Sequence, residues 1–294
     1  MSTPKRLQQQ SGRYALVDGI PFRMPVACEQ SPVLMAVFPI NADRAEVLMP
    51  GNELHPFRLW NKGLLVITVV NYQITNIGRY IEYSIAIACT HGPRRAPRLL
   101  PGLLMKTYDT GQFVFDLPVS TEISVKGGKG IWGMPKHQAN LDFQVTSRTV
   151  SAQYDLEGQL GMRIEIDRPR RANLPFRMAA ANFCQFRGLL MKSSIYFNGR
   201  IGFQFRKRGS ARLYIGDLPR LQPLKNLQIE ARPLLTAFLP SATGILDDHF
   251  ESWFLSFSAP PATAPEGLES VVNLDLSQQW LAPPSAPVLP KELV

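Results

Sequence analysis

Apolar runs at strand spacing dominate the chain and predict a protein built mostly of β-strands. Residues 64–72 form a continuous, β-branched apolar run, which is typical of a strand buried on both faces. Residues 80–90 repeat the pattern after a turn signal at Gly78, so the two runs predict a long hairpin. Shorter runs predict strands over residues 32–38, 111–116, 211–215 and 227–231, and a strand pair over 140–167.

Turn and cap signals add a second hairpin and a first helix. Asn198-Gly199 is the strongest short-range hairpin signal in the chain and predicts a turn within residues 195–205. Residues 41–49 predict a helix, because Asn41 is a good N-cap and Pro50-Gly51 follows the segment.

Two further helices are expected. A short one follows Pro118, with Ser120 or Thr121 as its cap, and is expected to end at Gly127-Gly128. Residues 234–254 are apolar and then amphipathic. Four of their large side chains are expected to share a helical face packed into the core: Leu246, Phe250, Trp253 and Phe254.

Together these elements predict an α+β fold in which strands dominate and helices are few. A large, curved, mostly antiparallel sheet is expected to close into a barrel-like structure that encloses a pocket. One domain is expected over residues 20–258. It would follow a mobile lead-in, residues 1–19, and precede a proline- and alanine-rich tail, residues 259–294.

One face of the predicted strand 80–90 carries polar and small side chains. Because side chains alternate along a strand, Tyr80, Glu82, Ser84, Ala86 and Ala88 share this face. Such a face suits the wall of a cavity. The alternative is that Glu82 faces water on a half-buried strand.

Residues 127–143 are the most unusual stretch, and Lys136 lies at their centre. Pro135 fixes its own φ and favours an extended conformation at Met134. Four glycines permit turns and close backbone approach, at positions 127, 128, 130 and 133. The chain is therefore predicted to present Lys136 in a defined direction. A solvated loop lysine is the alternative.

The chemical interest of Lys136 is that a neutral amine is a nucleophile. With an ordinary pKa of about 10.4, less than about 0.1% of a lysine is neutral at pH 7. Desolvation by Ile131, Trp132 and Met134, or like charge from a protonated His137, would lower that pKa. The free amine would then add to a ketone and lose water, giving a Schiff base that serves as an electron sink.

Two segments also carry a family resemblance: Gly-Lys-Gly-Ile-Trp-Gly-Met-Pro-Lys-His at residues 128–137, and Ile-Gly-Arg-Tyr-Ile-Glu at residues 77–82. In this order they resemble the active-site segments of the acetoacetate decarboxylase superfamily. The resemblance implies that Lys136 forms the Schiff base and that Glu82 is a catalytic or site-shaping acid. It also implies a barrel-like fold. In acetoacetate decarboxylase itself, a neighbouring cation activates the lysine.

The chain departs from the family pattern at several points. The decarboxylase has a second lysine directly after the nucleophile, where this chain has His137. A further acid of the family falls on Ile67 when counted back from Glu82 without gaps. The family's N-terminal arginine has only Arg23 as a candidate. These differences leave Schiff-base chemistry in place and put acetoacetate itself in doubt as the substrate.

Composition narrows the remaining possibilities. Apolar residues make up 45% and charged residues 19% of the 294, a balance that permits a globular core. The net charge of +9 comes mainly from arginine clusters beside prolines and glycines, which indicates solvated loops rather than a nucleic-acid site. The three cysteines are widely spaced and the four histidines lack metal-ligand spacing, so neither disulfides nor a metal is expected.

The sequence thus favours a cytoplasmic enzyme that acts on a small oxo acid, with neither a signal peptide nor a membrane span expected. Decarboxylation of a β-keto acid is the first interpretation, and aldol or dehydration chemistry on a 2-oxo acid is the alternative. A non-catalytic binding protein for small acids is a third. Tyr80, Trp132, Met134 and His137 are expected to contact the substrate. No cofactor is required, and the resemblance implies a homo-oligomer.

Overall fold

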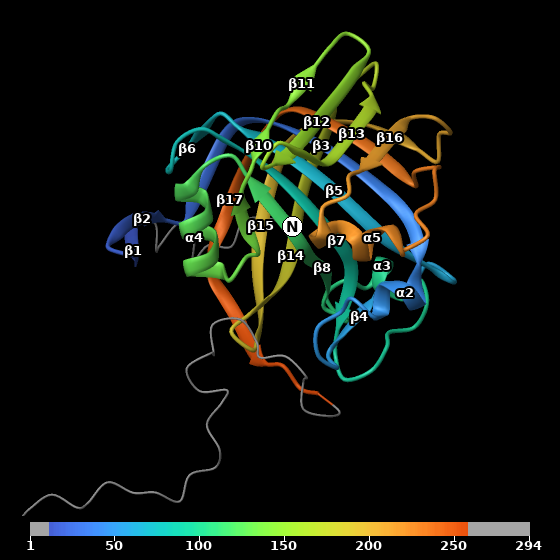
Figure 1. The fold of residues 1–294 in the computed structure, drawn as a ribbon, viewed down its shortest axis with the longest axis horizontal. Coiled ribbons are helices and arrows are strands. Elements are labelled where there is room, and N and C mark those ends of the chain that lie inside the picture. Colours follow the sequence, from blue (N-terminus) through green and yellow to red (C-terminus); the bar gives the residue numbers. More distant parts are fainter. Residues whose placement is uncertain (1–11, 258–294) are drawn as a thin grey trace, which may run out of the picture.

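A closed barrel of seven strands forms the centre of the molecule (Figure 1). The computed structural model describes residues 12–257. The barrel strands are hydrogen-bonded in the order β7, β5, β3, β17, β15, β14 and β8, and β8 closes the barrel by pairing with β7. Their bounds are β3 Val26–Asn41, β5 Lys62–Tyr72, β7 Tyr80–His91, β8 Thr110–Val119, β14 Leu174–Phe186, β15 Leu189–Phe205 and β17 Leu235–Phe254.

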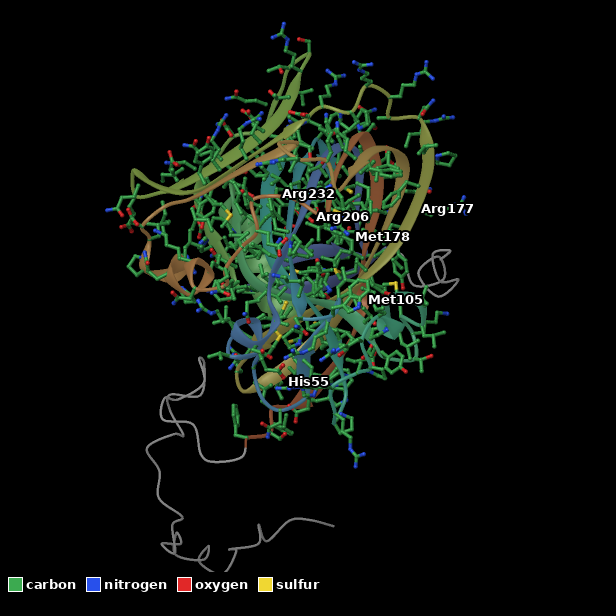
Figure 2. The ribbon with its side chains drawn as sticks, turned by 90° about the vertical axis from the view of Figure 1, so that its right-hand side faces the viewer. His55, Met105, Arg177, Met178, Arg206 and Arg232 are labelled. Atoms are coloured by element: carbon green, nitrogen blue, oxygen red, sulfur yellow. The ribbon has the colours of Figure 1, made fainter. Side chains whose placement is uncertain are left out.

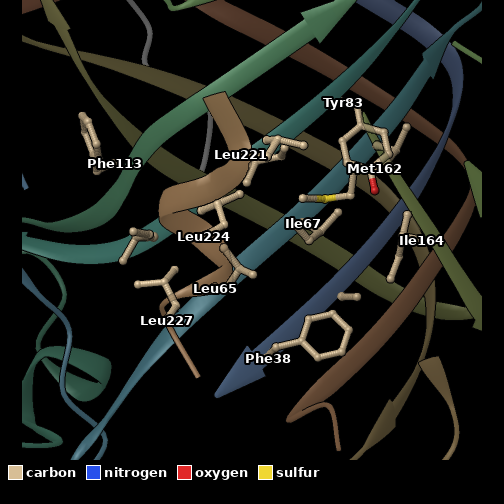
Figure 3. Packing of buried hydrophobic residues seen from close by; sticks show 14 of the residues in the cluster. Phe38, Leu65, Ile67, Tyr83, Phe113, Met162, Ile164, Leu221, Leu224 and Leu227 are labelled. Atoms are coloured by element: carbon tan, nitrogen blue, oxygen red, sulfur yellow. The ribbon is translucent and has the colours of Figure 1, made fainter. Parts of the chain in front are cut away.

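A second, smaller sheet packs on one side of the barrel. Its strands are β10 Asn140–Leu141, β11 Gln144–Val145, β12 Thr149–Leu156, β13 Gln159–Asp167 and β16 Ala211–Ile215. The largest buried cluster lies between the two sheets and includes Tyr83 and Ile67 from the barrel and Met162 and Ile164 from the second sheet (Figure 3). The short helix α5, Gln222–Lys225, adds Leu224 to this cluster.

This packing explains the continuous apolar run of β5. Leu65, Ile67 and Val69 face the core between the sheets, whereas Thr68 and Val70 face the interior of the barrel. A strand covered on both sides does not need alternating polar residues. The predicted hairpin is also confirmed, because β5 pairs antiparallel with β7 in a register that sets Tyr72 opposite Tyr80.

Short elements complete the fold. The remaining strands are β1 Arg13–Val17, β2 Ile20–Met24, β4 Leu54–Pro56, β6 Ile74–Thr75 and β9 Lys136–Gln138. The remaining helices are α2 Ala42–Glu46, α3 Leu100–Leu103, α4 Glu122–Trp132 and the 3-10 helix η1 Pro219–Leu221. The predicted cap of α2 is confirmed, since the Asn41 side chain accepts hydrogen bonds from two backbone amides of its first turn. The strand-dominated α+β barrel expected from the sequence is therefore the observed fold.

The predicted hairpin turn at Asn198-Gly199 is wrong. β15 runs through both residues, and the chain reverses at Arg187-Gly188 instead. Gly199 is needed for another reason: a Cβ there would lie 2.8 Å from the backbone oxygen of Ser241 on β17. The β15–β17 register also shifts between Gly199 and Gly202. The glycine signal therefore marks an irregularity within a strand.

The helix expected within residues 234–254 is also wrong, because this segment is the 20-residue strand β17. β17 pairs along its two edges with β3 and β15, and these hydrogen bonds override a helical pattern of apolar residues. As a strand it directs Leu246 into the barrel and leaves Phe254 85% exposed. Residues 227–231 were expected to form a strand and instead form an irregular segment after α5.

Helix α4 does not end at Gly127-Gly128 as predicted. It continues to Trp132 and ends at Gly133, which has a φ of 63°. The glycines at 127, 128 and 130 are sites of close approach, because a Cβ there would meet Phe22, Lys136 and Val17 respectively. Val17 belongs to the β1–β2 hairpin, so the expected lead-in of residues 1–19 is wrong from residue 13 onward. The expected tail, residues 259–294, lies outside the described residues.

The arginine clusters lie in loops, as expected. Residues 94–98 follow β7, residues 168–171 connect β13 to β14, and residues 206–208 connect β15 to β16. Figure 2 shows Arg206 and Arg232 close together on one face. There, Nε of Arg232 donates a hydrogen bond of 2.7 Å to the backbone oxygen of Arg206. Within residues 12–257, none of the helices has the length and apolar character of a membrane span.

Candidate functional site

The interior of the barrel contains a cavity lined by side chains from all seven barrel strands and from the segment that ends α4. Its space between atoms, the mouth included, is about 750 Å³. The polar lining residues are Cys28, Thr68, Tyr72, Thr75, Tyr80, Glu82, Ser84, Gln112, Lys136 and Asn182. The others are Val26, Val70, Val114, Leu117, Met134, Ile195, Phe197, Gly244, Ile245 and Leu246.

Lys136 enters this cavity at the first position of β9. β9 pairs in parallel with β8, and Lys136 lies opposite Leu117. The backbone reverses at Gly133, and the amide of Met134 then donates to the carbonyl of Gly128 at 3.1 Å. This turn brings the aliphatic part of Lys136 against Gly128, where an added Cβ would lie 2.3 Å from Lys136 Cδ. The Lys136 side chain is consequently only 4% exposed.

Three groups surround the Lys136 amine. Its Nζ lies 2.7 Å from Oε2 of Glu82 and donates to the Ser124 hydroxyl at 3.0 Å. The ring of Tyr80 has its centroid 5.5 Å from the same nitrogen. The nearest charged group is thus the carboxylate of Glu82, and not the neighbouring cation expected from the sequence.

A stacked pair of tyrosines holds Glu82 from the other side. The hydroxyl of Tyr72 donates to Oε1 of Glu82 at 3.4 Å, and the rings of Tyr72 and Tyr80 stack with centroids 4.5 Å apart. Burial, followed by the charge of Glu82, raises the pKa of both tyrosines well above the ordinary value. They therefore remain protonated hydrogen-bond donors at neutral pH. Burial likewise raises the pKa of the Cys28 thiol to about 11, so this cavity thiol is neutral.

Four of the six predicted site residues line the cavity: Lys136, Glu82, Tyr80 and Met134. Trp132 and His137 do not. Trp132 is buried behind the cavity wall, where its indole Nε1 donates to the backbone oxygen of Asp247 at 2.8 Å. His137 follows Lys136 on β9 and therefore points to the opposite side of the strand. The cavity lining therefore lacks these two of the four side chains that were expected to contact the substrate.

His137 belongs to a buried polar cluster on the far side of β8 and β9. Asp116 is 1% exposed, and its Oδ1 lies 3.5 Å from His137 Nε2 and 3.4 Å from Arg220 Nη2. The Tyr154 hydroxyl donates to Asp116 Oδ2 at 3.4 Å. Burial lowers the pKa of His137 to about 4, so His137 is neutral at pH 7 and does not act on the Lys136 amine as a cation.

The same cluster predicts a pH-dependent stability. Burial, opposed by the charge of Arg220, raises the pKa of Asp116 to about 6 from an ordinary value near 3.8. The folded state therefore binds this proton more tightly, and Asp116 favours folding most below pH 4 and least above pH 6. We expect the stability of the wild type relative to Asp116→Asn to fall by up to about 3 kcal/mol over that window.

Urea unfolding of both proteins at several pH values between 4 and 7 measures this difference. His137 works in the opposite direction, since its depressed pKa adds stability as the pH rises. Taking the difference between the two proteins removes most of the His137 contribution. A difference that stays constant over this range would contradict the assignment of a raised pKa to Asp116.

The sequence analysis missed Ser124, which contacts the Lys136 amine, and three residues that line the cavity: Tyr72, Gln112 and Asn182. Ser124 lies one helical turn before Gly128, and a helix drawn through the glycines would have placed both on one face. The predicted hairpin over residues 64–90 would have placed Tyr72 opposite Tyr80, as the structure does. Gln112 and Asn182 lie on β8 and β14, and nothing in the local sequence indicates that these strands pair.

Ile67 and Arg23, two of the positions at which the chain departs from the family pattern, lie outside the cavity. Ile67 is fully buried in the core between the sheets, and the cavity side of β5 carries Thr68 and Val70 in its place. Arg23 is exposed on β2 and does not line the cavity. Among the described residues, the cavity therefore has Glu82 as its one carboxylate and Lys136 as its one cation. This site brings one amine and one carboxylate together in a cavity with ten polar residues among its twenty lining residues.

Comparison with known proteins agrees with these observations. The sequence model of the acetoacetate decarboxylase family matches residues 9–187. No curated protein sequence matches the chain significantly.

Solved structures show a similar fold at low sequence identity. A structure of acetoacetate decarboxylase has a TM-score of 0.58 and 13% identity over 79% of this chain and 90% of that chain. Acetoacetate decarboxylase from Legionella pneumophila subsp. pneumophila str. Philadelphia 1 has a TM-score of 0.57 and 12% identity over 76% of this chain and 85% of that chain. The enduracididine biosynthesis enzyme MppR, solved with pyruvate, has a TM-score of 0.53 and 14% identity over 79% and 90% of the two chains.

Proposed function

The chain belongs to the acetoacetate decarboxylase family, and on that premise we propose that it is a carbon–carbon lyase that forms a Schiff base between Lys136 and a small oxo acid. The observation that carries this proposal is the contact of 2.7 Å between Lys136 Nζ and Glu82 Oε2 inside the cavity. A buried amine beside one proton acceptor has the groups that imine formation requires.

In the proposed reaction, the Lys136 ammonium gives a proton to Glu82 and the resulting amine adds to the carbonyl carbon of the substrate. The carbonyl oxygen takes up two protons, one from the attacking nitrogen and one from Glu82, and leaves as water. For a β-keto acid, the bond to the carboxylate then breaks, carbon dioxide leaves, and the electron pair moves into the iminium. Water supplies the proton that the enamine carbon takes up, with Glu82 as the relay, and hydrolysis of the resulting imine returns the ketone and the free amine.

The apolar part of the cavity suits the loss of carbon dioxide. Met134, Leu117 and Val114 line the cavity and belong to the buried cluster that includes Trp132. A carboxylate next to such residues is poorly solvated, and its conversion to neutral carbon dioxide removes the buried charge. Decarboxylation is therefore the reaction that we favour.

Aldol or dehydration chemistry on a 2-oxo acid is the second candidate. The observation that favours it is the loss of the second lysine and the second acid of the decarboxylase pattern, whose positions carry His137 and Ile67. MppR, which shares the fold, has been solved with pyruvate. Both candidates pass through the same imine on Lys136. Non-catalytic binding of a small acid is the third, and homo-oligomerisation remains a prediction.

Borohydride reduction tests the imine directly. The protein is incubated with acetoacetate or with pyruvate, reduced, and analysed by intact mass and peptide mapping. We expect an adduct on the peptide that contains Lys136, and an acetoacetate adduct that has lost carbon dioxide would favour the decarboxylase. An adduct on another lysine, or none with either acid or with longer oxo acids, would contradict the proposal.

Because Lys136 lies close against Gly128, we expect Gly128→Ala to lower the rate of imine trapping strongly and the free energy of unfolding only little. In Gly128→Ala, the new methyl group would overlap the stem of Lys136 and move its amine away from Glu82. Misplacement of a reacting group by about 1 Å costs on the order of 10²-fold in rate, so we expect imine trapping to slow by about 100-fold. Alanine is also the better helix residue, which offsets part of the strain in α4.

Gly130→Ala is the matched control on the same helix. Its methyl group would overlap Val17 of β1, outside the cavity, so it disturbs packing without touching Lys136. Trapping rates and thermal unfolding are measured for both variants. Equal trapping rates in the two variants would rule out a specific role for Gly128.

A further inference from the structure

The cavity contains a second polar site, remote from Lys136. Gln112 on β8 and Asn182 on β14 are register partners in a parallel strand pair. Both line the cavity, and Nε2 of Gln112 donates to Oδ1 of Asn182 at 2.8 Å. Asn182 is 8% exposed, and Ile195, Val114 and Leu246 are among the apolar side chains that line the same cavity.

This amide pair has unused hydrogen-bonding capacity. One bond occupies one of two amide hydrogens on Gln112 and one acceptor position on Asn182. Within residues 12–257, no side chain or backbone group bonds the Nδ2 of Asn182 or the Oε1 of Gln112. Three donor hydrogens, two on Asn182 and one on Gln112, and the carbonyl oxygen of Gln112 therefore remain for a group that enters the cavity. A ligand that left them unpaired would bind at a cost.

The amide pair is too far from Lys136 to share a very small substrate. Lys136 lies opposite Leu117 on β8, and Gln112 is five residues further along the same strand. At about 3.3 Å per residue, the two backbone positions are ~16 Å apart. After the reach of the side chains is subtracted, several ångströms of cavity remain, lined by Val114 on β8 and by Ser84 and Thr68 on β7 and β5. A ligand that contacts both sites needs a spacer that packs against Val114.

The charges of the cavity determine which end group suits the amide pair. Lys136 is the one cation among the described lining residues, and the proposed imine uses it. A second carboxylate at the remote end would be buried without a cation, which is costly. A neutral group that both donates and accepts hydrogen bonds matches the free amide hydrogens and the free carbonyl oxygen.

We infer that Gln112 and Asn182 form a specificity site, and that the preferred substrate is an oxo acid with a neutral polar group at its far end, such as a hydroxyl or an amide, beyond an apolar spacer. This inference rests on the proposed function for the reacting end of the molecule. The recognition of the far end depends only on the amide pair.

Three six-carbon 2-oxo acids that differ in their end group test the inference, with pyruvate as the short reference. They are 2-oxohexanoate, 6-hydroxy-2-oxohexanoate and 2-oxoadipate, which end in a methyl, a hydroxyl and a carboxylate. The concentration for half-maximal borohydride trapping on Lys136 is measured for each. We expect the lowest value for the hydroxyl-ended acid and the highest for the dicarboxylate.

Asn182→Leu and Gln112→Leu are expected to raise the half-saturating concentration of the hydroxyl-ended acid about tenfold. The value for pyruvate should change by less than about twofold, because pyruvate does not reach the amide pair. Gln185→Leu is the matched control, since Gln185 is exposed on the same strand as Asn182. No preference for the hydroxyl end in the wild type, or an equal effect of Asn182→Leu on all four acids, would overturn the inference.

Calorimetric titration with the same acids separates this inference from the proposed function. If none of the acids is trapped on Lys136, the proposed reaction fails. A calorimetric preference for the hydroxyl-ended acid that is lost in Asn182→Leu would still support the specificity site. If pyruvate is trapped but the three long acids bind equally, the specificity site fails while the reaction stands.

Discussion

Replacing Lys136 with arginine is expected to abolish the borohydride adduct completely while the protein still folds. Lys136 is the one lysine of the described chain that lines the cavity, and a guanidinium does not form an imine with a ketone. Arginine retains the positive charge beside Glu82, so this partly buried carboxylate keeps a partner. The loss should therefore appear in chemistry and not in the free energy of unfolding.

This variant also separates an enzyme from a binding protein. A protein that only binds a small acid would keep most of its affinity in Lys136→Arg, because the charge is unchanged. The measurements are intact mass after reduction, calorimetric affinity for pyruvate and a urea unfolding curve. Because Gly128 leaves little room beside the stem of residue 136, Lys136→Gln serves as a smaller second variant. An adduct of wild-type yield in either variant would exclude Lys136 as the nucleophile.

Replacing Glu82 with glutamine is expected to slow imine formation by about 10²–10⁴-fold, the range typical of a lost general base. Glutamine has nearly the same shape and keeps an oxygen for the Tyr72 hydroxyl, which lies 3.4 Å from Glu82. It does not take a proton from the Lys136 amine at neutral pH. The residue should therefore lose its chemical role while its packing is preserved.

Ser124→Ala is the matched control for Glu82→Gln. Ser124 accepts a hydrogen bond from the same nitrogen, but a serine hydroxyl does not act as the base that removes its proton. We expect this variant to slow trapping by less than about tenfold, as for the loss of a single hydrogen bond. The rates are measured by stopping the reaction with borohydride at increasing times. A Glu82→Gln rate within threefold of the wild type would show that another group, or water, takes the proton.

Much of the barrel wall was predictable from local sequence. The run at residues 64–72, the glycine at 78 and the run at residues 80–90 are neighbours in sequence, so their pairing follows from a short turn. Period-two alternation then sets Tyr80 and Glu82 on one face. The motif around Lys136 and the segment that ends at Glu82 pointed to one site, and the fold places both in the same cavity.

The direction of His137 shows where the sequence analysis failed. Adjacent residues of a strand face opposite sides, so the motif that carries Lys136 into the cavity necessarily carries His137 out of it. Nothing in the local sequence marks residues 134–137 as part of a strand. β9 is only three residues long, and its pairing with β8 exists only in the folded chain.

The sequence by itself determined the strand-rich class and the first hairpin, because each depends on residues close together in the chain, and its family resemblance singled out Lys136 and Glu82 as candidates. The tertiary structure decided that residues 235–254 form a strand, that α4 continues through three glycines, and that Gln112 meets Asn182. These features depend on hydrogen bonds and close contacts between segments far apart in sequence. Where such contacts satisfy the backbone on both edges of a segment, they outweigh its local preference.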